Sequence, residues 1–156
     1  MSTTAGTATA ARHKGIEVIE EFFGVGLAKR LVALGHQADL TVANNVLAHV
    51  PDIRDFVSGF ALLLKPQGVA TFEFPHVMRL IAENQFDTIY HEHFFYLSLT
   101  AVQSIFADNG LTIFDVEEHP THGGSLIFSA SQLAQLDLCE AIEAGTTLDP
   151  INSKRK

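Results

Sequence analysis

Several protein classes depend on features that this sequence has in short supply. A single cysteine, Cys139, stands among 156 residues, so an internal disulfide and a cysteine-based zinc site are both excluded. Basic residues are also few: 10 lysines and arginines face 18 acidic residues, which gives a formal net charge of −8. Because contacts to phosphates along a nucleic acid need clustered Lys and Arg, this balance argues against nucleic-acid binding.

Long apolar runs and a targeting sequence are absent as well. No run approaches the roughly 20 apolar residues of a membrane helix, so we expect no membrane association. The N-terminus lacks the charged-then-apolar order of a signal peptide. Hydrophobic residues make up 47% of the chain, enough for a buried core. These features predict a globular, soluble protein of the cytoplasm.

The order of strands and helices along the chain predicts the fold class. Apolar residues at helical spacing between capping residues indicate helices, and short apolar runs bounded by turns indicate strands. The expected strands are residues 16–23, 38–47, 69–74, 111–117 and 125–130, and the expected helices are 10–14, 24–34, 52–65, 76–82 and 98–109. This alternation predicts an α/β fold with a mostly parallel sheet and helices on both faces. The last two strands have no helix between them and are expected to be antiparallel.

Polar side chains follow two of the predicted strands at the point where each strand ends. Asn44, Asn45 and His49 follow one strand, and residues 73–76 follow the next. In sheets of this kind, ligands bind beyond the carboxyl ends of the strands. We therefore expect these side chains to meet at one rim of the sheet.

The densest set of reactive side chains lies in a polar loop, residues 83–96. Tyr90, His91, Glu92 and His93 are consecutive there. They supply hydrogen-bond donors, acceptors and a base that titrates near neutral pH. A loop that is merely rich in histidine is the alternative interpretation. Because functional residues concentrate on loops held by a rigid scaffold, we predict that this loop is catalytic.

Four blocks of sequence resemble a known family: ANNVLAHVPD, FEFPH, QFDTIYHEHF and PTHGGSL. Across residues 10–128 the chain is similar to the class I S-adenosylmethionine-dependent methyltransferases that methylate carbon in nucleotide-linked deoxysugars. The resemblance implies a Rossmann-like sheet and S-adenosylmethionine as cofactor. It also implies a substrate that is a nucleoside-diphosphate-linked 4-keto deoxysugar, with the methyl group added at C3.

The resemblance implies roles for the residues of the polar loop. A proton beside a ketone can be removed by a general base when a donor stabilises the enolate that forms. His93 is implied as this base, and Tyr90 as the group that hydrogen-bonds near the ketone or enolate. Glu92 would orient an imidazole or hold a sugar hydroxyl. His91 could point away from the site, because neighbours on an extended segment face opposite sides.

The ANNVLAHVPD block carries the remaining implied site residues. His49 is the second imidazole facing the sugar and the alternative base, or else a residue that only enters the next helix. Asn44 and Asn45 are implied to run along the cofactor, although one of them could instead cap that helix. The turn at residues 121–124 is expected near the sugar or as a purely structural turn.

The sequence departs from the family in its first part and after Ala130. It has no glycine-rich turn of the GxGxG type, which the family uses because its backbone must approach the cofactor closely. Gly24 and Gly26 give only a GVG, and the family's cysteine-rich zinc module is missing. We expect a partial methyltransferase domain at residues 1–130, holding about the second half of the cofactor-binding domain, and a divergent tail at 131–156.

Two alternatives to this methyltransferase stay open at the level of the sequence. A truncated core would expose strand edges and could act as a non-catalytic binding or assembly module, for instance as a homo-oligomer. A metal hydrolase could use His91 and His93, because H-x-H spacing puts both rings on one side of an extended segment.

Overall fold

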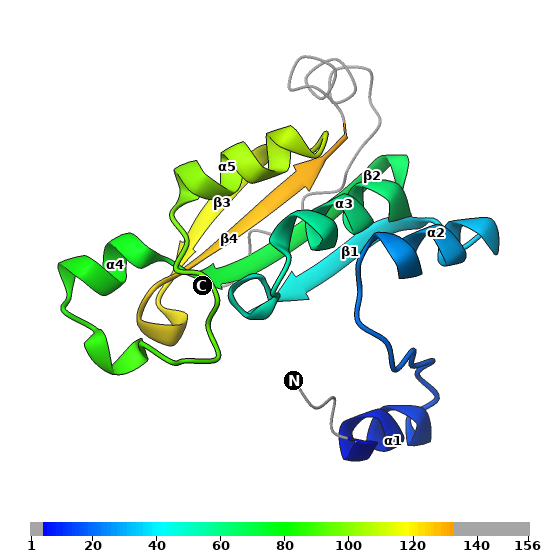
Figure 1. Ribbon diagram of the computed structural model, residues 1–156, viewed down its shortest axis with the longest axis horizontal. Coiled ribbons are helices and arrows are strands. Elements are labelled where there is room, and N and C mark those ends of the chain that lie inside the picture. The colour runs from blue at the N-terminus through cyan, green and yellow to red at the C-terminus, as the bar shows by residue number, and fades with distance from the viewer. Residues whose placement is uncertain (1–4, 133–156) are drawn as a thin grey trace, which may run out of the picture.

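The computed structural model describes residues 5–132, which form a four-stranded sheet with some of the helices packed against it and the first helix lying apart from it (Figure 1). The strands are β1 (Ala38–Asn44), β2 (Leu64–Pro75), β3 (Thr112–His119) and β4 (Ser125–Ser131). The helices are α1 (Ala5–His13), α2 (Val25–Ala33), α3 (Ile53–Leu63), α4 (Val77–Ala82) and α5 (Leu99–Asp108), with short 3-10 turns η1 (Leu47–His49), η2 (Phe86–Thr88) and η3 (Thr121–Gly123).

The sheet is mixed, with the strands in the spatial order β1-β2-β4-β3. β1 and β2 are parallel, whereas β4 is antiparallel to both of its neighbours. The predicted antiparallel pair is confirmed, but the prediction of a mostly parallel sheet is not. The reason is that β4 follows β3 after a tight turn and lies between β3 and β2. Two of the three pairings are therefore antiparallel, even though β1, β2 and β3 all run in one direction.

An aromatic cluster fills the space between the sheet and two helices. The ring of Phe72 in β2 lies 4.9 Å from that of Phe60 in α3 and 4.9 Å from that of Phe106 in α5. It also stacks on Phe128 of β4 at 5.2 Å. Ring pairs of this kind add to the stabilisation that comes from burying apolar area. Because α3 and α5 both contact Phe72, they cover the same face of the sheet.

The opposite face of the sheet is open at β1. Ala43 pairs with Phe72 in the register of β1 and β2, so its neighbour Val42 points to the other side. Val42 and Leu40 are 61% and 57% exposed. Within residues 5–132, no helix covers this face of the sheet at β1. The prediction of helices on both faces is therefore wrong for this part of the sheet.

Capping residues mark the helix boundaries that the sequence predicts. The Asp52 carboxylate accepts a hydrogen bond from the Asp55 N–H at 3.0 Å, and α3 begins there. Ser98 accepts from the Ala101 N–H at 3.3 Å at the start of α5. The satisfied N–H groups stabilise the first turns of both helices. β2, in contrast, begins directly after α3, several residues before the strand that the sequence predicts.

Residues 16–23 do not form the predicted strand. Phe23 alone of this segment packs firmly, with its ring 4.6 Å from that of Phe60. Phe22 is 79% exposed, and Glu21 pairs with Arg30 at the surface. The segment crosses to α2 without a strand beside it to pair with, so its β-branched residues do not extend the sheet. α1, in turn, is longer than the predicted helix 10–14.

No helix within residues 5–132 has the length and apolar character needed to cross a membrane. Of the predicted tail, Ser131 ends β4 and Gln132 follows it. The rest of that prediction lies outside the described residues.

Candidate active site

The carboxyl ends of β1 and β2 form one wall of the candidate site. The chain leaves β1 at Asn44, earlier than predicted, and turns at Asn45, whose φ is 54°. Asparagine adopts this left-handed conformation more readily than most residues. The Asn45 N–H donates to the Glu73 carbonyl of β2 at 2.8 Å. The turn then leads into η1, which ends at His49.

The predicted catalytic loop is fastened to this wall by its backbone. The Phe94 N–H donates to the Ala48 carbonyl at 2.8 Å, and the Val77 N–H donates to the Leu97 carbonyl at 3.0 Å. The His93 N–H donates to the Tyr90 carbonyl at 3.1 Å, which closes a tight turn. These bonds hold the loop and the residue after it against η1, which is distant in sequence, and against the start of α4, the helix that precedes the loop.

A cavity of about 300 Å³ lies between the loop and the strand ends. Five of the six predicted site residues line it: Asn45, His49, Tyr90, Glu92 and His93. The sixth, Asn44, is the exposed last residue of β1 and is not part of the lining. The structure therefore brings the catalytic candidates together in one cavity, together with one of the two asparagines. We call this space the aromatic cavity.

His93 lies at the centre of a group of rings. Its ring centroid is 4.6 Å from that of His49, 5.3 Å from that of Tyr90 and 5.6 Å from that of Tyr96. His49 Nδ1 is 3.3 Å from the Glu92 carbonyl oxygen. A carbonyl only accepts, so this contact needs the proton on Nδ1 and leaves Nε2 of a neutral His49 free to accept. Both imidazoles are thus arranged as candidate bases.

Burial lowers the pKa of His93 below its usual value of 6.5, and the neighbouring His49 lowers it further. Glu92 opposes these effects by raising the pKa. Burial and a like charge both disfavour the protonated imidazolium. His93 is therefore neutral at pH 7 and able to accept a proton.

Other residues complete the lining and were not singled out from the sequence. Tyr96 donates from its hydroxyl to the Tyr90 carbonyl at 3.2 Å, which ties the end of the loop back to its middle. Gln85 and Thr88 also line the aromatic cavity. Tyr96 could have been recognised from the sequence, because it ends the aromatic run that follows His93. No sequence pattern marks Gln85 as a site residue. His76 lies in the segment that the sequence placed at the rim.

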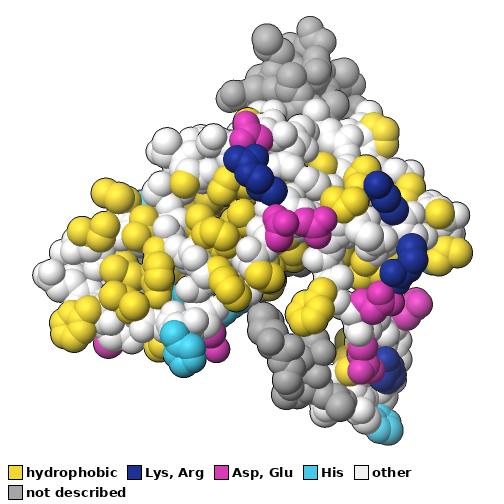
Figure 2. All heavy atoms as spheres, in the orientation of Figure 1, with side chains coloured by type: hydrophobic (Ala, Val, Ile, Leu, Met, Phe, Trp, Pro, Cys, Tyr) yellow, Lys and Arg dark blue, Asp and Glu magenta, His cyan; other side chains and the backbone are white. Residues whose placement is uncertain are grey.

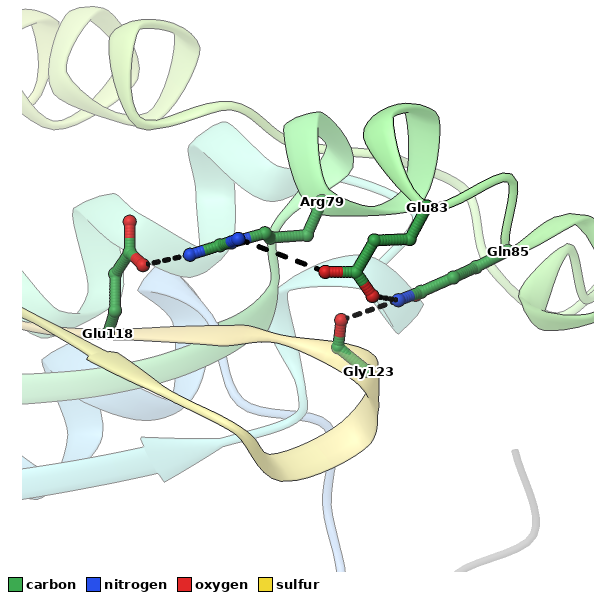
Figure 3. Close-up of polar contacts among 5 residues, drawn as sticks. All are labelled: Arg79, Glu83, Gln85, Glu118 and Gly123. Atoms are coloured by element: carbon green, nitrogen blue, oxygen red, sulfur yellow. Dashed lines mark hydrogen bonds and ion pairs between the residues drawn. The ribbon is translucent and has the colours of Figure 1, made fainter.

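The turn between β3 and β4 is attached to the same end of the sheet. Thr121 donates from its hydroxyl to the buried Glu73 carboxylate at 3.0 Å. The Gln85 amide donates to the Gly123 carbonyl at 2.7 Å, a contact drawn in Figure 3. The His76 N–H donates to the Gly124 carbonyl at 3.0 Å. The PTHGGSL block therefore borders the aromatic cavity.

The chain from residue 5 to residue 132 contains no group of three His, Cys, Asp or Glu side chains that could hold a metal ion. His91 does not line the aromatic cavity that contains His93. The metal-hydrolase alternative therefore finds no support in this part of the chain.

Asn45 provides an unpaired polar atom in the wall of the cavity. Its side-chain oxygen Oδ1 is buried and has no hydrogen-bond partner among the described residues. A buried polar atom without a partner costs free energy, and a bound donor group would relieve that cost. The position thus suits a ligand that carries a hydrogen-bond donor such as an ammonium group.

Comparison with known proteins identifies relatives by sequence. Residues 7–116 match the family model described as a methyltransferase domain. The chain is also 36% identical over 124 residues to the C-methyltransferase NovU of Streptomyces niveus. The matched region is 80% of this chain and 30% of NovU, so the chain spans about 30% of the length of this curated relative.

Solved structures share the fold at lower sequence identity. A SAM-dependent methyltransferase from Thermotoga maritima has a TM-score of 0.59 at 14% identity, over 83% of this chain and 70% of that one. Magnesium protoporphyrin IX methyltransferase (ChlM) from Synechocystis, with bound SAH, has a TM-score of 0.51 at 19% identity, over 66% of this chain and 48% of that one. At these identities the likeness is one of fold.

Proposed function

The chain belongs to the methyltransferase domain family, and on this premise we propose that it is an S-adenosylmethionine-dependent C-methyltransferase. Its proposed substrate is a nucleoside-diphosphate-linked 4-keto deoxysugar, methylated at C3, and its proposed location is the cytoplasm. The observation that carries the proposal is the grouping of His49, Tyr90, Glu92 and His93 in one cavity at the strand ends. The likeness to a C-methyltransferase supports carbon as the acceptor atom.

The grouped side chains match the two needs of enolate formation. His93 is neutral and takes the C3 proton of the sugar as general base. Tyr90 donates its phenolic proton in a hydrogen bond to the 4-keto oxygen, where negative charge develops. Glu92 holds a sugar hydroxyl or orients an imidazole. His49, at 4.6 Å from His93, is the alternative base because its Nε2 is free to accept.

The cofactor has a candidate contact in the same wall. S-adenosylmethionine supplies the electrophilic methyl group when it is bound. The buried, unpaired Oδ1 of Asn45 fits the ammonium group of the cofactor's amino-acid part. Asn44 remains a second proposed contact, although its side chain is exposed at the end of β1.

Exchange of the C3 proton tests the base directly. In deuterated buffer with S-adenosylhomocysteine, the chain should catalyse the exchange of the C3 proton of a nucleotide-linked 4-keto-6-deoxysugar for deuterium. Proton NMR monitors the loss of the C3 proton signal. His93→Asn should slow the exchange by about 100-fold or more, because general-base catalysis contributes that much. Circular dichroism of the variant should match that of the parent chain.

A matched variant distinguishes the two imidazoles. If His49→Asn stops the exchange and His93→Asn leaves it unchanged, then His49 is the base and the assignment to His93 is wrong. If the folded parent chain exchanges no deuterium at all, enolate formation is not its chemistry.

A non-catalytic assembly module is the second candidate, favoured by one specific observation. β1 is an edge strand whose outward face exposes Leu40 and Val42. Such an edge can pair with another chain, including a second copy of this one. Sedimentation of the parent chain should then detect a dimer that Val42→Lys converts to monomer. A monomer at all concentrations would remove this candidate.

A further inference from the structure

A second cavity, of about 360 Å³, adjoins the aromatic cavity. The two share His76 and Gly124 in their linings, so the His76–Gly124 contact lies where they meet. The linings differ in character. Several aromatic and imidazole rings line the first cavity, whereas the charged side chains of Arg79, Glu83 and Glu118 line the second. We call it the polar cavity.

Arg79 is the one Lys or Arg residue that lines either of these two cavities within residues 5–132. Its guanidinium donates to the Glu118 carboxylate at 2.7 Å and lies 3.8 Å from that of Glu83 (Figure 3). A guanidinium has five N–H donors in a planar fork, which matches the oxygens of a phosphate group. Only part of this donor capacity is used in the pair with Glu118.

Both of these ion pairs are of the weak, solvent-exposed kind. The side chain of Arg79 is 49% exposed and that of Glu118 is 61% exposed. Such pairs contribute little to stability, because water and salt screen the attraction between the charges. Arg79 can therefore exchange the Glu118 carboxylate for a stronger, bidentate anion, while Glu118 turns to the solvent.

The turn between β3 and β4 fixes where the guanidinium lies. Gly124 has a φ of 113°, and a Cβ at this position would come within 2.9 Å of Arg79 Cγ. The aliphatic part of Arg79 thus packs closely against this glycine turn. His119 lines the same cavity, with its Nε2 at 3.1 Å from a carboxylate oxygen of Glu117.

We propose that the polar cavity is the subsite for the diphosphate of the substrate, with Arg79 binding it in exchange for Glu118. This inference rests on the function proposed above. When the sugar binds among the rings around His93, the diphosphate attached to it extends out of the aromatic cavity. The polar cavity adjoins the aromatic cavity and contains the guanidinium of Arg79. Arg79 is then a specificity residue for nucleotide-linked sugars over free sugars.

Calorimetric titration of the whole chain with inorganic pyrophosphate and with thymidine diphosphate tests the subsite. Arg79→Gln should weaken the binding of both by about tenfold to 100-fold, the loss expected for a hydrogen-bonded charge. Arg54→Gln is the matched control, because Arg54 pairs with Asp108 at 2.9 Å on the surface and lines neither cavity. It should bind both anions as the parent chain does.

A second variant separates anion binding from a merely structural ion pair. Glu118→Gln should tighten pyrophosphate binding several-fold, because it removes the competing carboxylate. Unchanged or weaker binding in this variant would contradict the exchange. The subsite is also wrong if Arg79→Gln binds pyrophosphate as well as the parent chain does, or if the folded parent chain binds none.

The subsite and the proposed function can fail separately. If Arg79→Gln loses pyrophosphate binding but the parent chain transfers no methyl group, the anion subsite stands and the function falls. If the parent chain methylates a nucleotide-linked sugar and Arg79→Gln does so with an unchanged KM, the function stands and the subsite falls.

Discussion

At the scale of single residues, His93 has the surroundings of a base that works near neutral pH. Its ring is partly covered, it faces His49, and its pKa lies below the usual value. Asn45, just after the end of β1, carries a buried side-chain oxygen that has no hydrogen-bond donor among the described residues. The proposed proton acceptor and the proposed cofactor contact therefore line the same small cavity.

Removing His49 should shift the pH dependence of C3 exchange. His49 lowers the pKa of His93, so His49→Asn should raise that pKa toward its usual value. As the pH falls, His93 is then protonated at a higher pH than in the parent chain. The acid limb of the pH–rate profile therefore shifts to higher pH. Glu92, Tyr90 and Tyr96 also face His93 and are unchanged in this variant. An acid limb that stays in place would contradict the coupling.

Asn45 should contribute more to cofactor affinity than its neighbour. Asn45→Gly removes the carboxamide and tolerates the φ of 54°. It should weaken S-adenosylhomocysteine binding by about tenfold in a calorimetric titration. Asn44→Ala, which alters an exposed side chain outside the aromatic cavity, should weaken the affinity less than Asn45→Gly does. Equal losses in the two variants would argue against the contact.

At the scale of elements, the turn between β3 and β4 contacts α4 and the start of the predicted catalytic loop. Gln85 donates to the Gly123 carbonyl, and Gly124 accepts from His76. A Cβ on Gly123 would come within 2.4 Å of Gln85 Oε1. The two glycines therefore allow α4 to approach the turn closely enough for both cavities to form.

Gly124→Ala should destabilise the chain more than a comparable change elsewhere. Its φ of 113° is unfavourable for any residue with a Cβ, and the added atom meets the near end of the Arg79 side chain. We expect a loss of about 2–3 kcal/mol in the free energy of unfolding, measured with urea. Gly110→Ala, with a φ of 75° and no atom within 4 Å of the added Cβ, should lose about 1 kcal/mol. Equal losses would mean that the close contact with α4 has no effect.

The sequence predicts these elements well where local chemistry determines them. Asp52 and Ser98 cap the helices that were expected to begin at these positions, because an N-cap acts on N–H groups two or three residues away. The place of β4 between β2 and β3 depends on pairing across the sheet, which local patterns do not encode. The meeting of Arg79 with Glu118 likewise joins positions 39 residues apart. The strand predicted at residues 16–23 is wrong because no neighbouring strand pairs with it.

At the scale of the whole molecule, apolar side chains are buried on one side and exposed on another. The core lies between the sheet and the helices α3 and α5. Figure 2 shows hydrophobic side chains at the surface over α4 and the loop that follows it, where Met78, Ile81, Phe86 and Ile89 are exposed. A core covered on one side leaves a small margin of stability.

The aromatic cluster should therefore dominate the stability of the chain. Phe72→Ala removes a fully buried ring that contacts three other phenylalanines. It should lower the free energy of unfolding by about 3–5 kcal/mol. Phe22→Ala is the matched control, because Phe22 is largely exposed, and it should change the free energy by less than about 0.5 kcal/mol. Similar losses in both variants would contradict the position of the core.

Transfer of a labelled methyl group is the measurement that tests the proposed activity most directly. The chain is incubated with methyl-labelled S-adenosylmethionine and a nucleotide-linked 4-keto-6-deoxysugar, and the product is examined by carbon NMR. We predict a labelled methyl group bonded to C3, and its loss in His93→Asn. A folded chain that binds S-adenosylhomocysteine but leaves the sugar unlabelled, or that labels oxygen or nitrogen instead, would contradict C-methylation in this cavity.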